Sequence, residues 1–148
     1  EVITELAKVE NIIGIKEASG SLAKASQILE NTVDEDFIVL SGDDGLTLPI
    51  MAVGGSGVIS VAANVVPDKM SGMVNAALKG DYVTARKFHY EMAPLIRALF
   101  LETNPIPVKK AADLAGLASG HVRLPLGPLA DANTEKLAEE LRKLGVLK

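Results

Sequence analysis

Short apolar runs alternate with segments of helical spacing through the first 60 residues of the chain. Apolar positions recur every three to four residues in three segments, which is typical of a helix with one buried side; these are residues 2–9, 22–33 and 46–53. Between them lie compact runs rich in Val and Ile, which are typical of buried strands; these are residues 11–16, 37–41 and 58–61. Turn residues separate the segments. The pattern therefore predicts three strands that alternate with helices.

Such an alternation is the signature of an α/β fold, because right-handed β-α-β crossovers make neighbouring strands parallel. A parallel sheet is normally covered by helices on both faces. Three strands alone would leave two sheet edges with unpaired backbone groups, and we expect further strands to pair with them.

Beyond Asn64 the pattern changes to helices only. Helical spacing, Pro near helix starts and Gly after helix ends predict four helices, over residues 67–78, 81–102, 109–115 and 134–144. The sequence therefore predicts two parts, the strand-containing residues 1–66 and the helical residues 67–148.

Composition narrows the function classes. The 148 residues suffice for one domain at about 100 to 200 residues per domain. A net charge of −4 and the lack of a basic stripe argue against nucleic acid as a partner. The chain has no cysteine, and no apolar run is long enough to span a membrane. We expect a soluble, cytoplasmic protein that acts on small molecules and, since no initiator Met is present, a piece of a longer chain.

Lys16 is the strongest candidate for chemistry. Side chains alternate along a strand, so Lys16 shares a face with Gly14, and we expect the glycine to leave space beside the amine. The carboxyl end of a parallel strand is where α/β proteins place their active sites. A desolvated lysine is a nucleophile toward ketones. Pattern alone nevertheless favours a lysine that reaches solvent.

Other polar motifs have simpler interpretations. Asp43 and Asp44 could bind a divalent cation or transfer protons, but a tight turn with a helix cap is favoured. Residues 54–57, Gly-Gly-Ser-Gly, could hold a phosphate, but they precede a strand instead of leading into a helix. His89 and His121 lie far apart in the pattern and are interpreted as surface or packing residues, with no metal site expected.

Several separate motifs together resemble the dihydrodipicolinate synthase family, within the superfamily of lyases and aldolases that form a Schiff base with pyruvate. In chain order they are Gly14-Ile-Lys-Glu-Ala-Ser-Gly20, Ser41-Gly-Asp-Asp44, Gly54-Gly-Ser-Gly-Val-Ile-Ser-Val61 with Asn64, Asn104-Pro-Ile-Pro-Val-Lys109 and Leu124-Pro-Leu126. The resemblance covers essentially the whole chain.

The resemblance implies an α/β fold of a particular kind, the C-terminal half of a (β/α)8 TIM barrel with strands six to eight, followed by a helical C-terminal extension. It implies that Lys16 is the catalytic residue that forms the Schiff base with pyruvate, and that the resulting enamine attacks L-aspartate 4-semialdehyde in lysine biosynthesis. It further implies that Ile59 touches pyruvate through its backbone and that Gly42 lines the same pocket. No cofactor and no metal are expected.

The chain also departs from the family pattern. The Tyr-Asn-x-Pro-like strand with the family's catalytic tyrosine and the Gly-Thr-Thr-like turn that binds the pyruvate carboxylate are both missing, and Tyr82 and Tyr90 do not replace them. We therefore expect the N-terminal half of the same protein as a partner, and a homo-oligomer, a tetramer or a dimer, in the full protein.

Two other functions remain open at this point. N-acetylneuraminate lyases and 2-keto-3-deoxy-sugar aldolases of the same superfamily share the lysine and the barrel, although residues 104–108 favour the synthase. Alternatively, the piece has no catalysis of its own and serves as a half-barrel assembly module.

Overall fold

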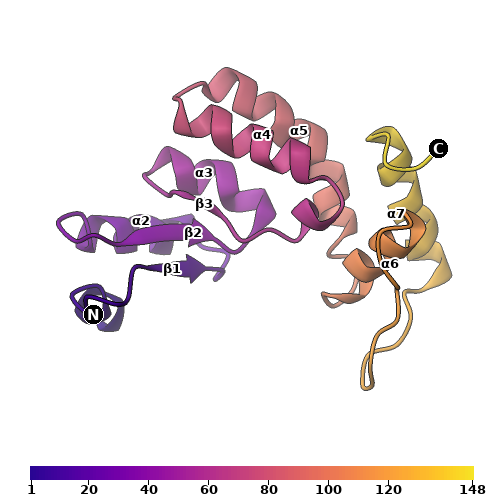
Figure 1. The fold of residues 1–148 in the computed structure, drawn as a ribbon, viewed down its shortest axis with the longest axis horizontal. Helices are drawn as coiled ribbons and strands as arrows, with labels where there is room; N and C mark the ends of the chain where they lie inside the picture. Colours follow the sequence, from indigo (N-terminus) through magenta and orange to yellow (C-terminus); the bar gives the residue numbers. More distant parts are fainter. The chain divides into compact units, whose positions relative to one another are not determined.

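The computed structural model describes all of residues 1–148, and Figure 1 shows the course of the chain. The strands are β1 (Gly14–Glu17), β2 (Ile38–Ser41) and β3 (Gly57–Val58). The α-helices are α1 (Val2–Leu6), α2 (Leu22–Asn31), α3 (Thr47–Ala52), α4 (Pro67–Leu78), α5 (Tyr82–Ala98), α6 (Ile106–Leu114) and α7 (Asp131–Lys143). Two short 3-10 helices, η1 (Asp44–Leu46) and η2 (Ala62–Asn64), follow β2 and β3.

These elements form two compact units. The first unit contains residues 1–60 and 73–86, and the second contains residues 61–72 and 87–148. The chain therefore passes between the units three times, after Ser60, within α4 and within α5. The expected division into residues 1–66 and 67–148 stays a prediction from the sequence.

The first unit is built on the predicted parallel sheet. Its strands lie in the order β1-β2-β3, and both pairs are parallel. Lys16 is paired with Leu40, and Leu40 is paired with Gly57. This confirms an α/β arrangement with three parallel strands. It also leaves β1 and β3 as edge strands within this chain.

Helices α2 and α3 contact β2 and each other. Helix α2 begins where predicted, because the Ser21 side chain accepts a hydrogen bond from the Lys24 N–H at 3.2 Å. Its side chains at Ala25 and Ile28 are buried. Helical spacing thus turns the apolar side of α2 toward the interior of the first unit.

Strand β3 is shorter than the predicted strand over residues 58–61. The chain turns into η2 instead, because the Val61 and Ala62 carbonyls accept local hydrogen bonds from the Asn64 side chain and the Val65 N–H. Ladder pairing nevertheless continues for one residue, since the Ile59 N–H donates to the Ser41 carbonyl at 2.8 Å.

The second unit is helical and has an apolar core of its own, in which Met92, Leu95, Leu99, Leu137 and Leu141 are fully buried. The predicted helices exist, but their ends differ. Helix α5 stops at Ala98 because the Phe100 and Leu101 N–H groups bond to carbonyls three instead of four residues back. Helices α6 and α7 each begin three residues earlier than predicted. Pro107 is tolerated there, since the first turn of a helix needs no N–H from it. No helix of the structure is long and apolar enough to cross a membrane.

Candidate active site

The three site residues expected from the sequence lie on one side of the parallel sheet of the first unit. Alternation along the paired strands places Lys16, Gly42 and Ile59 on the same face, at the carboxyl ends of β1, β2 and β3. Lys16 is exposed, and its ammonium makes no ion pair or hydrogen bond within the chain. The arrangement presents a free amine at the end of the sheet where α/β proteins carry out their chemistry.

Gly42 lies against the lysine stem. A Cβ atom placed on Gly42 would lie 2.8 Å from the Lys16 Cε atom and 2.6 Å from the Ala18 Cβ atom. Real Cβ atoms do not approach other atoms this closely, so only glycine lets the lysine lie across the end of β2. Lys16 and Gly42 therefore form one contact, although 25 residues of sequence separate them.

Gly14 has a different role from the one expected. A Cβ atom on Gly14 would lie 2.5 Å from the Ile38 carbonyl oxygen and 2.6 Å from the Ile38 Cγ1 atom. The expectation that Gly14 leaves open space beside Lys16 is therefore wrong, because Ile38 of the neighbouring strand fills that space. Gly14 lets β1 and β2 approach each other.

Glu17 was not singled out from the sequence. It follows Lys16 on β1, and its side chain lies on the opposite, helix-covered face with 4% of its surface exposed. Its Oε1 atom accepts a hydrogen bond from the Ser19 N–H at 3.0 Å, and its Oε2 atom is enclosed without a hydrogen-bond partner. The signal available in the sequence was the alternation itself, which places a carboxylate at a position meant for a buried side chain.

The turn after β2 has the predicted capping role. The Asp43 carboxylate accepts hydrogen bonds from the Gly45 and Leu46 N–H groups at 2.8 and 3.3 Å, which begins η1. The Ser41 hydroxyl donates to the Asp43 carbonyl at 2.7 Å and fixes the same turn. This confirms the turn interpretation for Asp43.

The glycines of residues 54–57 serve packing. A Cβ atom on Gly55 would lie 2.6 Å from the Ile50 Cγ2 atom, and Gly54 has a φ of 114°, which other residues rarely adopt. The segment thus closes the turn from α3 into β3.

The two histidines lie in different surroundings of the second unit. His89 is half-buried on α5 and packs edge-on against Tyr90, with ring centroids 5.6 Å apart. Burial lowers the pKa of His89, whose Nδ1 atom is enclosed without a hydrogen-bond partner. No group of three acidic or histidine side chains in the structure is placed to hold a metal ion.

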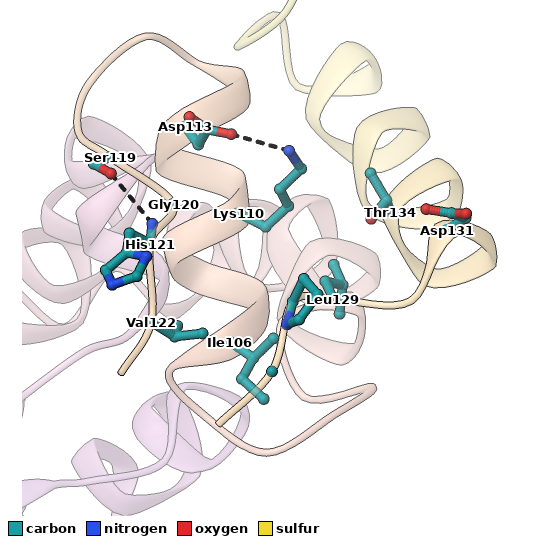
Figure 2. A pocket seen from close by; sticks show the side chains of 12 residues that line it. Ile106, Lys110, Asp113, Ser119, Gly120, His121, Val122, Leu129, Asp131 and Thr134 are labelled. Atoms are coloured by element: carbon teal, nitrogen blue, oxygen red, sulfur yellow. Dashed lines mark hydrogen bonds and ion pairs between the residues drawn. The ribbon is translucent and has the colours of Figure 1, made fainter. Parts of the chain in front are cut away.

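His121 lines a hollow of about 430 Å³ in the second unit, between α6, α7 and the loop that joins them (Figure 2). Lys110 and Asp113 of α6 form an ion pair of 2.9 Å within it, and this hydrogen bond holds the pKa of the Asp113 carboxyl below its usual range. The His121 N–H donates to the Ser119 hydroxyl at 3.2 Å. Lys110 is therefore already paired with Asp113 inside the hollow. The hollow does not include Lys16, Gly42 or Ile59.

The first unit thus has an exposed lysine at the carboxyl end of one strand of a parallel sheet. The chain belongs to the dihydrodipicolinate synthetase family, whose model matches residues 1–144. This confirms the resemblance seen in the motifs.

Two relatives show how close the similarity is. The chain is 80% identical over 147 residues to the 4-hydroxy-tetrahydrodipicolinate synthase of Methanosarcina mazei, which covers 99% of the chain and 50% of that protein. It is 66% identical to the synthase of Methanococcoides burtonii, again over 99% of the chain and 50% of the relative. The chain thus spans about half the length of the curated relatives it matches.

Solved structures agree with the fold. The chain superposes on the dihydrodipicolinate synthase of Thermotoga maritima with a TM-score of 0.94 and 37% identity, over 98% of the chain and 50% of that structure. The synthase of Aquifex aeolicus gives a TM-score of 0.92 with 43% identity, over 98% of the chain and 49% of that structure. The fold therefore matches half of a synthase chain.

Proposed function

We propose that this chain contributes the lysine-bearing half of a 4-hydroxy-tetrahydrodipicolinate synthase, which condenses pyruvate with L-aspartate 4-semialdehyde. The observation that carries the proposal is the free Lys16 amine, which lies across Gly42 at the carboxyl end of a parallel strand. The names of relatives up to 80% identical support the same activity. A location in the cytoplasm is part of the proposal.

The chemistry assigned to Lys16 is imine formation. The neutral amine would attack the C2 carbonyl carbon of pyruvate, and loss of water would give the imine. Removal of a methyl proton then gives an enamine, and its carbon forms the new bond to the aldehyde carbon of L-aspartate 4-semialdehyde, whose oxygen takes up a proton. Withdrawal of an amine from water favours its neutral form, so a cover over this open face would assist the first step.

The proposed roles of Gly42 and Ile59 follow from their places beside the lysine. Gly42 would leave room for the Lys16 stem and line the pyruvate pocket. The Ile59 N–H is already bonded to the Ser41 carbonyl, so a backbone contact of Ile59 with pyruvate would use its carbonyl oxygen. Neither residue would transfer protons.

The remaining parts of the proposal concern partners and the larger fold. Residues 1–66 would be part of a (β/α)8 barrel and would contribute its strands six to eight, and residues 67–148 would provide the last barrel helix and the C-terminal extension. The catalytic tyrosine and the carboxylate-binding threonines would come from the N-terminal half. The open face and two edge strands of the sheet support this pairing. A homo-oligomer is expected of the full protein.

Reductive trapping tests the proposed function. The chain is combined with the first half of the Methanosarcina mazei relative and treated with pyruvate and borohydride, which reduces the imine to a stable secondary amine. Peptide mass spectrometry should locate the adduct on Lys16. Lys16→Arg should abolish trapping, whereas Lys79→Arg, at an exposed lysine of the same unit, should leave it unchanged.

Each result bears on a different part of the proposal. An adduct on another lysine, or full trapping by Lys16→Arg, contradicts the mechanism. Trapping on Lys16 without turnover of L-aspartate 4-semialdehyde contradicts the second substrate and favours a different aldolase. No adduct at all favours an assembly module without catalysis.

A further inference from the structure

The burial of the Glu17 carboxylate costs free energy. A buried carboxylate loses hydration, and the fold must return that free energy through hydrogen bonds or ion pairs. Glu17 is 4% exposed, yet one of its two carboxylate oxygens has no hydrogen-bond partner. Stability alone does not account for a glutamate here.

Its ion pair does not account for it either. The Lys24 ammonium lies 3.7 Å from the Glu17 Oε1 atom, and the Lys24 side chain is 54% exposed. A pair with this separation and this access to water contributes little to stability. The well-formed contact is the 3.0 Å hydrogen bond from the Ser19 N–H to Oε1.

That hydrogen bond ties together the segments that flank the lysine. The Glu17 side chain holds the first residues of the loop after β1, and the Glu17 main-chain carbonyl accepts a 2.7 Å hydrogen bond from the Gly42 N–H. Ala18, between Glu17 and Ser19, meets Gly42 from the same side as the Lys16 stem. Glu17 thus anchors both the loop and Gly42 around Lys16.

We infer that Glu17 is a positioning residue for Lys16. Its carboxylate fixes the loop after β1, so that Ala18 and Gly42 confine the lysine stem to one course over the sheet. The carboxylate lies on the face opposite the amine and does not touch the substrate. The inference rests on the proposed function of Lys16.

The test uses the chain combined with the first half of the Methanosarcina mazei relative. Glu17→Met fills a similar volume without an acceptor, and Glu17→Gln retains an oxygen that can accept from Ser19. Glu30→Gln, at an exposed glutamate of α2, is the matched control. The measurements are the rate of pyruvate trapping at saturation, the pyruvate concentration for half-maximal rate, hydrogen exchange of the Ser19 amide and unfolding by urea.

A positioning role predicts that Glu17→Met lowers the rate of pyruvate trapping without lowering the stability of the fold. Glu17→Met should trap pyruvate about tenfold more slowly at saturation, because a displaced nucleophile loses its alignment. The half-maximal concentration should change far less, the Ser19 amide should exchange faster, and stability should be equal or higher because a buried charge is removed. Glu17→Gln should recover most of the rate, and the control should match the unchanged chain.

The outcomes separate this inference from the proposed function. Trapping by Glu17→Met at the unchanged rate overturns the positioning role and leaves the Schiff base intact. Glu17→Gln as slow as Glu17→Met also overturns it, since the charge and not the acceptor would then matter. Absence of trapping in the unchanged protein overturns both proposals.

Discussion

The two faces of the parallel sheet differ in how they are covered. On β2, Val39 faces the helices and is fully buried, whereas the preceding Ile38 is 40% exposed on the other face. Ile59, on that same open face, is 49% exposed. Residues of the same kind, adjacent in sequence, thus differ in whether they contribute to the core of this chain.

The difference teaches which face stabilises the unit and which one carries the candidate chemistry. The covered face buries apolar side chains against α2 and α3 and so contributes hydrophobic free energy. On the open face, the Lys16 stem lies beside small residues, Gly42 and Ala18. Exposed apolar area of this kind is typical of a surface that binds another segment or a ligand.

The largest expected effect comes from placing the same charge on each face of β2. Val39→Asp buries an unpaired carboxylate and should lower the free energy of unfolding by about 3 kcal/mol or more. Ile38→Asp puts the carboxylate in water and should cost about 1 kcal/mol or less in the isolated chain. Urea unfolding followed by circular dichroism measures both.

Assembly should remove the tolerance of Ile38→Asp. Ile38→Asp should prevent association with the first half of the Methanosarcina mazei relative, as measured by sedimentation, because closure would bury the carboxylate. Equal stability of the two variants in the isolated chain, or undisturbed association of Ile38→Asp, would show that the two faces are not different in kind.

A smaller effect is expected at Gly42, where the open face meets the lysine. Gly42→Ala places a Cβ atom too close to the Lys16 Cε and Ala18 Cβ atoms, and relief of such a clash costs about 1–3 kcal/mol. The lysine stem should move, so the rate of pyruvate trapping should fall. The free energy of unfolding should fall by no more than this cost. Gly127→Ala, where a Cβ atom meets nothing within 4 Å, is the control. An unchanged trapping rate in Gly42→Ala would separate Gly42 from the lysine.

The sequence predicts features that depend on neighbouring residues of the chain. It does not predict close contacts between strands. The parallel strands, the Ser21 cap and the Asp43 turn were predictable because hydrophobic spacing and capping act over a few residues. The roles of Gly14 and Gly42 were not, since they depend on which atoms of a neighbouring strand fill the space above each glycine.

The buried carboxylate shows a second limit of local reasoning. Glu17 lies beside the candidate nucleophile in sequence, but its burial depends on α2 folding over the strand, which residue type alone argues against. The lengths of β3 and α5 were overestimated for a related reason, because backbone groups at element ends choose between ladder, helix and turn partners that no hydrophobic pattern reports.

The smallest effect sharpens the comparison from the covered side. Ser21→Ala removes the side chain that accepts from the Lys24 N–H, and loss of such a cap costs about 1 kcal/mol. Hydrogen exchange at the Lys24 amide should accelerate, with a slight fall in the unfolding midpoint. Pyruvate trapping should keep its rate, because the loop after β1 stays fixed by the Glu17–Ser19 hydrogen bond, which Glu17→Met removes. Slower trapping in Ser21→Ala would mean that any loosening of the covered face reaches the lysine, and that the Ser19 bond has no special part in positioning it.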